Sequence, residues 1–285
     1  MKIRCYSDIH LDTHCADENP FVSLDSQGRP NFWYPPDMPD DKETTLILAG
    51  DVWIGTRWIE WCGFSWINYV ASKFKEVIVV FGNHDLWPHS KLSIKNHKDK
   101  AGVLLQDLGI FNVHILDSSV LVRGDVLFVG NTLWSSMNKQ DPLAMYRMPQ
   151  YMNYDGKIAF DTGPNGAWTR FTSQLWVDLH HKQKEYIRLI ADQNPTKKIV
   201  VVTHHVPILG TGEPQYINDP GNCYYESDLS DIILDNPHIK LWCCGHMHNH
   251  CNEIVGKTLI YRNPVGYSHE QKDQQGLIKH EVINV

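Results

Sequence analysis

The chain has 285 residues, a length that allows one large α/β domain or two small ones, and we expect one. Hydrophobic residues make up 42% and charged residues 21% of it, which excludes a disordered or fibrous protein. The net charge of -7, without a basic cluster, argues against stable binding to duplex nucleic acid, although cations held in a site would add positive charge locally.

The cysteine content indicates a reducing compartment. Seven cysteines form an odd set without the even spacing of a disulfide framework, so we expect reduced thiols in a cytoplasmic protein. The first residues lack the apolar stretch of a signal peptide, and no apolar run approaches the roughly 20 residues that span a bilayer. We therefore expect no membrane partner, and the sequence pattern specifies no oligomeric state.

Short apolar runs rich in β-branched residues predict buried strands. They lie at 3–6, 45–49, 77–81, 113–116, 126–129, 199–202 and 241–244. Residues 57–73 and 173–193 have the periodicity of helices, and the second places Leu175, Leu179, Tyr186 and Ile190 on one face. Strands that alternate with helices predict a layered α/β fold.

Two predicted hairpins interrupt this alternation. Gly124 and Asp125 separate the runs 120–123 and 126–130, and Gly256 and Lys257 separate 252–255 and 258–262. Residues 277–285 are expected to add a last strand. Antiparallel ribbons beside parallel strands predict a mixed sheet, or two sheets packed face to face.

Two segments, 135–170 and 209–225, are rich in glycine and proline and show no sustained period. We interpret both as excursions from the domain. Two interpretations of each stay open: the excursions shape a substrate pocket, or they are surface loops without a role.

Five short polar motifs follow predicted strands. They are 8–10 (DIH), 50–51 (GD), 82–85 (GNHD), 203–205 (THH) and 245–248 (GHMH). Ligands of open α/β sheets bind outside the carboxyl ends of strands, so the motifs stand where a site is expected. Alternate residues of an extended segment project to one side, so Asp8 and His10, or His246 and His248, can converge on a cation. Glycines before three motifs are expected to allow sharp turns.

Each motif alone is weak evidence, because an Asp at a strand end is more often a turn former or a helix cap than a ligand. All five in this order favour a metal site in which Asp51, from a neighbouring strand, bridges two cations. A structural zinc site is the alternative, because cysteines and histidines crowd between 243 and 251. Cys243 and Cys244 are consecutive in a strand, however, and are expected to face opposite sides as core thiols.

The five motifs resemble those of the calcineurin-like metallophosphoesterases. That pattern is Asp-x-His, Gly-Asp, Gly-Asn-His-Asp/Glu, a His at a strand end and Gly-His-x-His, and every element is matched between residues 8 and 248. The segments 129–134 (VGNTLW), 202–207 (VTHHVP) and 262–267 (RNPVGY) resemble a bacterial clade of this superfamily. The resemblance implies an α/β fold, a four-layer α/β/β/α sandwich of two mixed sheets, as a single domain over residues 1–285.

The resemblance also implies two divalent metal ions, with manganese, iron or zinc suited to the ligands. The first would be held by Asp8, His10, Asp51 and His248, and the second by Asp51, Asn83, His204 and His246. By the family pattern we choose His204 over His205. A hydroxide between the metals would attack phosphorus, and His84, oriented by Asp85, would stabilise or protonate the leaving oxygen. Activity should rise above mildly acidic pH, where the histidine ligands are neutral.

The function predicted from these motifs is metal-dependent hydrolysis of a phosphomonoester or phosphodiester. A nuclease acting on single-stranded or small nucleic acids is one alternative, although it would normally show a basic surface or a capping domain. A catalytically inactive binding scaffold is another, although such proteins usually lack a ligand or the leaving-group histidine, and here the set is complete. Asn131 and Arg262 either contact the substrate or tie loops together, and we expect the structural role for each.

Overall fold

The structure is a computed structural model, and it describes residues 1–13, 25, 28–55, 61–87, 94–161, 168–270, 272 and 275–285, without the side chains of 61, 62, 94 and 95. Positions 57–60 of the expected helix 57–73, together with Cys15, therefore lie outside the described residues. The described cysteine side chains are free thiols, at Cys5, Cys223, Cys243, Cys244 and Cys251.

The first sheet has strand order β13-β1-β2-β3-β4, in which β1 to β4 are parallel and β13 pairs antiparallel with β1. Its strands are β1 (Lys2–Tyr6), β2 (Thr44–Ala49), β3 (Glu76–Val80), β4 (Val113–Leu116) and β13 (Ile283–Asn284). The expected last strand over 277–285 is thus reduced to two residues. Helices α1 (Trp61–Lys73) and α2 (Ile94–Asp107) belong to the same half of the chain.

The second sheet has strand order β11-β12-β10-β9-β6-β5. Its strands are β5 (Ser119–Arg123), β6 (Val126–Asn131), β9 (Lys198–Thr203), β10 (Ile239–Cys244), β11 (Cys251–Val255) and β12 (Thr258–Arg262). The four strands in the middle are parallel, and β5 and β11 pair antiparallel with β6 and β12 as the two predicted hairpins. Helices α5 (Ser173–Gln193) and α6 (Ser230–Asp235) pack against this sheet.

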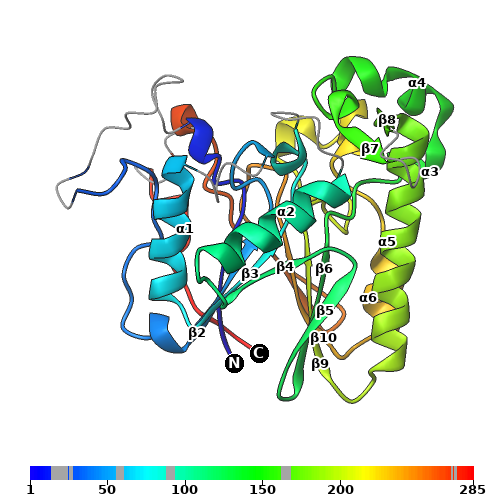
Figure 1. Ribbon diagram of the computed structural model, residues 1–285. Coiled ribbons are helices and arrows are strands. Elements are labelled where there is room, and N and C mark those ends of the chain that lie inside the picture. Colours follow the sequence, from blue (N-terminus) through cyan, green and yellow to red (C-terminus); the bar gives the residue numbers. More distant parts are fainter. Residues whose placement is uncertain are drawn as a thin grey trace.

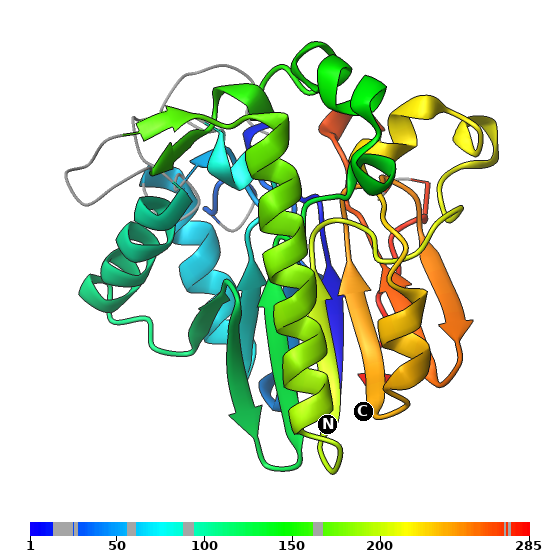
Figure 2. The same cartoon turned by 90° about the vertical axis from the view of Figure 1, so that its right-hand side faces the viewer.

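Three apolar cores hold four layers together. Ile47 and Val80 of the first sheet pack against Phe128 and Val202 of the second in a core between the sheets. One further core joins the first sheet to α1 and α2, and another joins the second sheet to α5 and α6. Figures 1 and 2 show these helices outside the two sheets. The α/β/β/α sandwich is confirmed.

The two chain excursions contain regular structure that the sequence pattern did not indicate. Residues 135–170 include α3 (Met137–Gln140), α4 (Pro142–Tyr151), η5 (Asp155–Lys157) and the hairpin of β7 (Ala159–Asp161) with β8 (Trp168–Arg170). The second excursion has the 3-10 turns η6 (Pro214–Tyr216) and η7 (Pro220–Tyr224). In Figure 1, α4, β7 and β8 lie at the end of the molecule opposite the two chain termini.

Further 3-10 turns are η1 (Leu11–Thr13), η2 (Asp41–Glu43), η4 (His84–Leu86) and η8 (Ser268–Glu270). Among the described residues, no helix has both the length and the apolar character needed to cross a bilayer. Cys243 packs in the core between the sheets and Cys244 in the core beneath α5 and α6, so the two thiols face opposite sides of β10 as expected.

Candidate metal centre

The five motifs come together at the carboxyl ends of parallel strands from both sheets. The Asp8 N–H donates to the Gly50 carbonyl (3.0 Å), which joins the loops after β1 and β2. The Gly245 N–H donates to the His204 carbonyl (2.9 Å), and the His246 N–H donates to the Asp8 carboxylate (2.9 Å). Two of these bonds join loops of the same sheet, and the bond to the Asp8 carboxylate joins the two sheets, so together they build one site from distant parts of the chain.

The site residues are not extended, so the expected reason for their convergence is wrong. Asp8, His10, Asp51 and His246 have φ values of 49°, 46°, 55° and 67°. This left-handed conformation costs a residue with a side chain roughly 1–2 kcal/mol. The surrounding loops impose it, as is common where backbone strain is stored at functional sites. The side chains converge because the chain turns, and not because alternate strand residues share a face.

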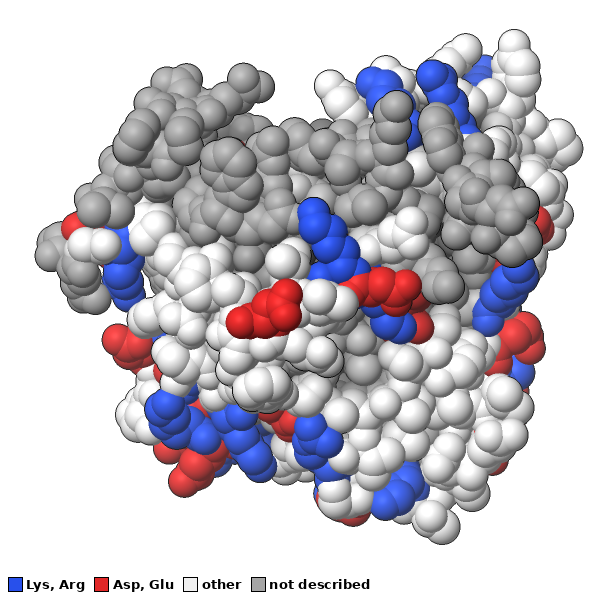
Figure 3. All heavy atoms as spheres, viewed as in Figure 1, with Lys and Arg blue, Asp and Glu red and all other residues white. Residues whose placement is uncertain are grey.

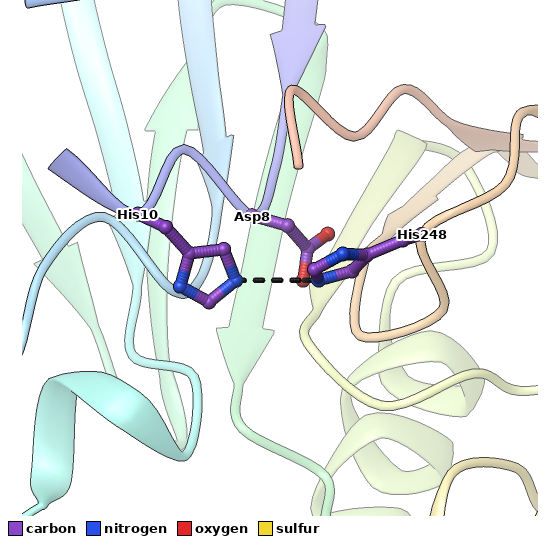
Figure 4. A group of neighbouring side chains, drawn as sticks. All are labelled: Asp8, His10 and His248. Atoms are coloured by element: carbon purple, nitrogen blue, oxygen red, sulfur yellow. Dashed lines mark hydrogen bonds and ion pairs between the residues drawn. The ribbon is translucent and has the colours of Figure 1, made fainter. Parts of the chain in front are cut away.

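One set of donor atoms gathers around His10 and His248. Their Nε2 atoms lie 3.2 Å apart, and Figure 4 shows Asp8 and the two histidines pointing toward one another. His248 Nε2 is 3.7 Å from Asp8 Oδ1, and His10 Nε2 is 3.9 Å from Asp51 Oδ2. Asp8, His10 and Asp51 are buried, and His248 is half-buried at the rim.

A second set of donor atoms surrounds His204. Its Nε2 lies 3.1 Å from Asn83 Oδ1, 3.2 Å from His246 Nδ1 and 3.3 Å from Asp51 Oδ2. Asp51 thus belongs to both sets. The structure brings together all seven residues that the sequence pattern nominates as metal ligands.

The donor chemistry fits divalent cations. Burial lowers the pKa of His10 and of His246 well below its ordinary value, so both imidazoles are neutral and offer lone pairs at pH 7. Nitrogen and oxygen lone pairs that face one another in a buried space need positive charge between them. Carboxylate, amide and imidazole donors suit manganese, iron or zinc.

Hydrogen bonds on the far side of two imidazoles fix their tautomers. His204 Nδ1 donates to the Ala49 carbonyl (2.9 Å), and His248 Nδ1 donates to Glu270 Oε1 (2.8 Å). In each ring, Nε2 is then the nitrogen that can offer a lone pair to a cation, as metal-binding histidines require. Although burial disfavours the charged ring, Asp51 raises the pKa of His204 to about 9, so a cation would displace a proton from this imidazole. Lys272 forms an ion pair with the other oxygen of Glu270. Glu270 lies in no recognisable motif, so the sequence pattern does not indicate its contact with His248.

Replacing Glu270 with Ala should weaken the first cation site by about 10–100-fold, because His248 loses the acceptor that orients its ring. Glu270→Gln keeps an oxygen acceptor and should lose less. The measurement is calorimetric titration of metal-free protein with Mn²⁺. Glu185→Ala, on the exposed face of α5, is the matched control. If Glu270→Ala binds the first cation as tightly as the wild type does, Glu270 does not orient His248 for metal binding.

His84 and Asp85 are both in the site, but Asp85 does not orient the His84 ring. The Asp85 carboxylate accepts the backbone N–H groups of Gly82, Asp51, Val52 and Trp53 at 2.7–3.1 Å. His84 Nδ1 has no hydrogen-bond partner among the described residues, and His84 Nε2 lies 3.9 Å from Asp51 Oδ2. The predicted contact is therefore corrected: Asp85 holds the loops that carry Asp51 and His84.

Three further polar residues, His205, Asn131 and Arg262, lie behind the site. His205 Nδ1 lies 3.3 Å from the Thr132 carbonyl, and its ring packs among Trp134, Trp176 and His246, so His204 alone of the pair reaches the donor cluster. Asn131 Nδ2 donates to a carbonyl of α5. Arg262 donates to carbonyls of the loops that contain residues 211 and 249. The expected structural roles of Asn131 and Arg262 are confirmed.

The glycines of the motifs serve close approach more than turning. Gly50 has φ +87°, the only left-handed one of the three. A Cβ atom on Gly50 would lie 2.4 Å from the His204 ring, one on Gly82 2.0 Å from Asp51 Oδ1, and one on Gly245 2.8 Å from Asp8 Oδ2. These distances are too short for any side chain, so each glycine packs directly against a donor residue.

Gly82→Ala should displace Asp51 and lower both metal content and stability, because overpacking a tight site costs about 1–3 kcal/mol. Metal analysis and thermal unfolding measure the two effects. Gly102→Ala is the control, since a Cβ on this residue of α2 meets nothing within 4 Å. It should keep full metal content and unfold at the same or a slightly higher temperature. Full metal content in Gly82→Ala would contradict the packing argument.

Two adjoining cavities open onto the donor cluster. An inner cavity of about 240 Å³ is lined by Asp51, Asn83 and His84, and an outer one of about 530 Å³ extends from His246 and His248. Both excursions contribute to the walls. The aromatic lining residues are Trp87, Tyr151, Tyr154, Tyr216, Tyr224, Tyr225 and Tyr267.

Comparison with known proteins agrees with this geometry. The calcineurin-like phosphoesterase family model matches residues 1–250, and the chain belongs to that family. An uncharacterized protein of Acanthamoeba polyphaga mimivirus is 28% identical over 285 residues, which cover 95% of this chain and 93% of the relative. The site therefore belongs to a phosphoesterase enzyme, and the family implies a dinuclear metal centre.

One solved structure shares the fold over nearly the whole chain. The phosphopantetheinyl hydrolase of Mycobacterium tuberculosis has a TM-score of 0.63 and 17% identity, covering 96% of this chain and 92% of its own. A 5'-nucleotidase precursor of Thermus thermophilus has a TM-score of 0.41 and 13% identity, covering 92% of this chain and 48% of its own. At 17% identity the likeness to the hydrolase concerns the fold alone, and the substrate has to be inferred from the site itself.

Proposed function

We propose that the protein hydrolyses a phosphomonoester or a phosphodiester with two divalent cations. The observation that carries this proposal is the position of Asp51, whose Oδ2 lies 3.9 Å from His10 Nε2 and 3.3 Å from His204 Nε2. One carboxylate stands between two donor sets, as two cations that share a bridging ligand require.

The two cations would share Asp51 and divide the other donors. The first would be held by Asp8, His10, Asp51 and His248, and the second by Asp51, Asn83, His204 and His246. Two bound cations supply the charge that activates water and neutralises a phosphoryl group in displacement. Carboxylate, amide and imidazole donors without a thiolate suit manganese, iron or zinc.

His84 would act on the leaving oxygen. It lines the inner cavity beside Asp51 and Asn83. Burial lowers the pKa of His84 to about 4, so the ring is neutral at pH 7. A neutral imidazole keeps one N–H, and this N–H would donate a hydrogen bond to the oxygen as negative charge develops on it.

The cavity walls suggest the kind of ester. Tyrosine and tryptophan rings offer flat apolar surfaces to a leaving group. No Lys or Arg belongs to the lining of either cavity within the described part of the chain, while Glu213 and Asp219 do. This favours an ester with one phosphoryl group and a flat leaving group over a polyphosphate, because further phosphates would meet no positive side chain there.

Under this proposal residues 1–285 act as one phosphoesterase domain, and the excursions 135–170 and 209–225 form the walls of its site. The free thiols of the described cysteines support a reducing, cytoplasmic location.

The test is reconstitution. Metal-free protein, prepared with a chelator, is loaded with Mn²⁺, Fe²⁺ or Zn²⁺, and its metal content is measured. Each form is then assayed on aryl phosphates, bis-aryl phosphates, mononucleotides, cyclic nucleotides and single-stranded nucleic acids. The proposal expects two cations per chain and turnover of at least one small ester. Fewer than two cations, or turnover of none, would refute it.

The alternatives have distinct outcomes in the same assay. A nuclease would cleave single-stranded nucleic acid faster than small esters, but on the face in Figure 3 lysine and arginine side chains are scattered among acidic ones and do not form a track. A binding scaffold would load metal without turnover. The complete donor set, with His84 beside it, favours the enzyme.

A further inference from the structure

A buried carboxyl group from the first excursion reaches into the metal centre. Asp155, in η5, has 1% of its surface exposed and lines the inner cavity. One of its oxygens, Oδ1, accepts two hydrogen bonds, from Asn83 Nδ2 (3.0 Å) and from Trp87 Nε1 (2.6 Å). Asn83 directly precedes His84, and Trp87 follows it by three residues, so one oxygen atom binds the chain on both sides of His84.

The first hydrogen bond decides which end of the Asn83 amide faces the donors. An amide has an oxygen that accepts and an NH₂ group that donates, in nearly the same shape. Because the NH₂ group is bound to Asp155, the oxygen points to His204 Nε2, 3.1 Å away. Without this acceptor the amide is free to turn over, and its NH₂ group would then face the cation site and repel a cation.

The second hydrogen bond holds the ring that sets the plane of His84. The Trp87 indole stacks on the His84 imidazole with centroids 3.5 Å apart and an interplanar angle of 26°. The rings of His10 and His84 pack in a T-shaped arrangement with centroids 4.6 Å apart, and Tyr154 also stacks on Trp87, with centroids 4.8 Å apart. His84 Nδ1 has no hydrogen bond in the described structure, so ring packing orients it.

We propose that Asp155 is a positioning residue of the phosphoesterase site, which orients Asn83 toward the second cation and, through Trp87, orients His84 toward the leaving oxygen. The inference rests on the proposed function. It assigns the excursion 135–170 a task beyond forming a wall: the excursion supplies a carboxyl group on which two parts of the centre depend.

Metal binding tests the Asn83 half of the proposal without any substrate. Metal-free protein is titrated with Mn²⁺ in a calorimeter. Asp155→Ala should weaken the second site by about 10–100-fold and leave the first unchanged, as loss of a group behind a ligand does. Asp155→Asn keeps an oxygen acceptor in the same shape and should restore the affinity to within about threefold. Circular dichroism and thermal unfolding establish that both variants are folded.

A double-mutant cycle separates positioning from a general effect on the fold. If Asp155 acts through the Asn83 amide, Asp155→Ala should weaken the second site no further in an Asn83→Ala background, so the two effects are not additive. Additive losses, or an equal loss at both sites that Asp155→Asn fails to restore, would overturn the proposal. If the wild type binds two cations but hydrolyses no ester, the proposed function fails, while this cycle still decides the role of Asp155.

Kinetics test the Trp87 half. Trp87→Phe keeps an aromatic ring but has no N–H, so the ring loses its attachment to Asp155. We expect kcat on a phenyl ester to fall by about two- to tenfold, the effect of one hydrogen bond, with an unchanged affinity of the second cation site. Asp155→Ala should lower kcat further, because it loses both contacts. If kcat is unchanged in Trp87→Phe, Asp155 orients Asn83 alone, and the proposed link from Asp155 through Trp87 to His84 is wrong.

Discussion

Asp51→Ala should lose turnover by at least about a thousandfold, because the shared ligand of two cations contributes several kcal/mol to the stabilisation of the transition state. The structure gives two reasons for so large an effect. Asp51 Oδ2 lies 3.9 Å from His10 Nε2 and 3.3 Å from His204 Nε2. Asp51 Oδ1 accepts a hydrogen bond from the backbone N–H of His84 at 2.9 Å. One substitution therefore disturbs both donor sets and the leaving-group histidine.

The metal content of the variant shows whether turnover is lost because cations are lost. The bound cations should fall from two per chain to one or fewer in Asp51→Ala, and Asp51→Asn, which keeps one oxygen, should bind more weakly than the wild type. Asp192→Asn, an exposed carboxylate on α5, is the matched control and should change neither quantity. A variant at position 51 that holds two cations and turns over the ester at the normal rate would end the bridging assignment.

The stability of the metal-free protein should depend on Asp51 through its pairing with His204, 3.3 Å away. The Asp51 carboxylate is buried, and in the described structure its backbone contact is the His84 N–H alone. Burial opposes the charge of Asp51, but His204 outweighs burial, so the pKa of Asp51 lies well below its usual value and that of His204 is raised to about 9. Removing one partner of a buried pair leaves the other unpaired, so metal-free Asp51→Ala should unfold at a lower temperature than the metal-free wild type. Metal content is therefore compared at a temperature at which circular dichroism shows both proteins to be folded.

The placement of the ligands could be predicted from the sequence for a physical reason. Parallel strands end at a common edge, so polar residues after β1, β2, β3, β9 and β10 have to lie near one another. The strands themselves were readable as short β-branched runs, and α5 as a helix from its periodicity. Helices α2, α4 and α6 were missed: α4 contains Pro142 and Pro149, which usually mark a helix limit or interruption, and α6 has only six residues.

Other features of the site could not be predicted from local pattern. Asp155 and Glu270 belong to segments without periodicity, and their partners Asn83 and His248 lie 72 and 22 positions away. The role of Asp85 was misjudged because a sequence shows that a carboxylate is present and not which donors it faces. Left-handed φ at Asp8 and His10 follows from contacts between loops, which no propensity of Asp or His specifies.

The role of His84 is open to the sharpest kinetic test. His84 Nε2 lies 3.9 Å from Asp51 Oδ2, and His84 forms a possible donor group with His10 and Asp51, so the geometry alone also allows it to be a ligand. Within the described residues His84 Nδ1 has no hydrogen-bond partner, and the ring lines the inner cavity; both observations favour action on the leaving oxygen. The two roles predict different metal contents.

His84→Ala should keep both cations and lose about 10²–10³-fold in kcat on phenyl phosphate, the usual effect of removing one donor to a developing oxyanion. The loss should be smaller on p-nitrophenyl phosphate, whose leaving oxygen carries its negative charge without help. His181→Ala, an exposed histidine of α5, controls for removal of an imidazole. If His84→Ala instead loses one cation, and the two esters slow equally, then His84 is a metal ligand and the leaving oxygen departs without a donor from this histidine.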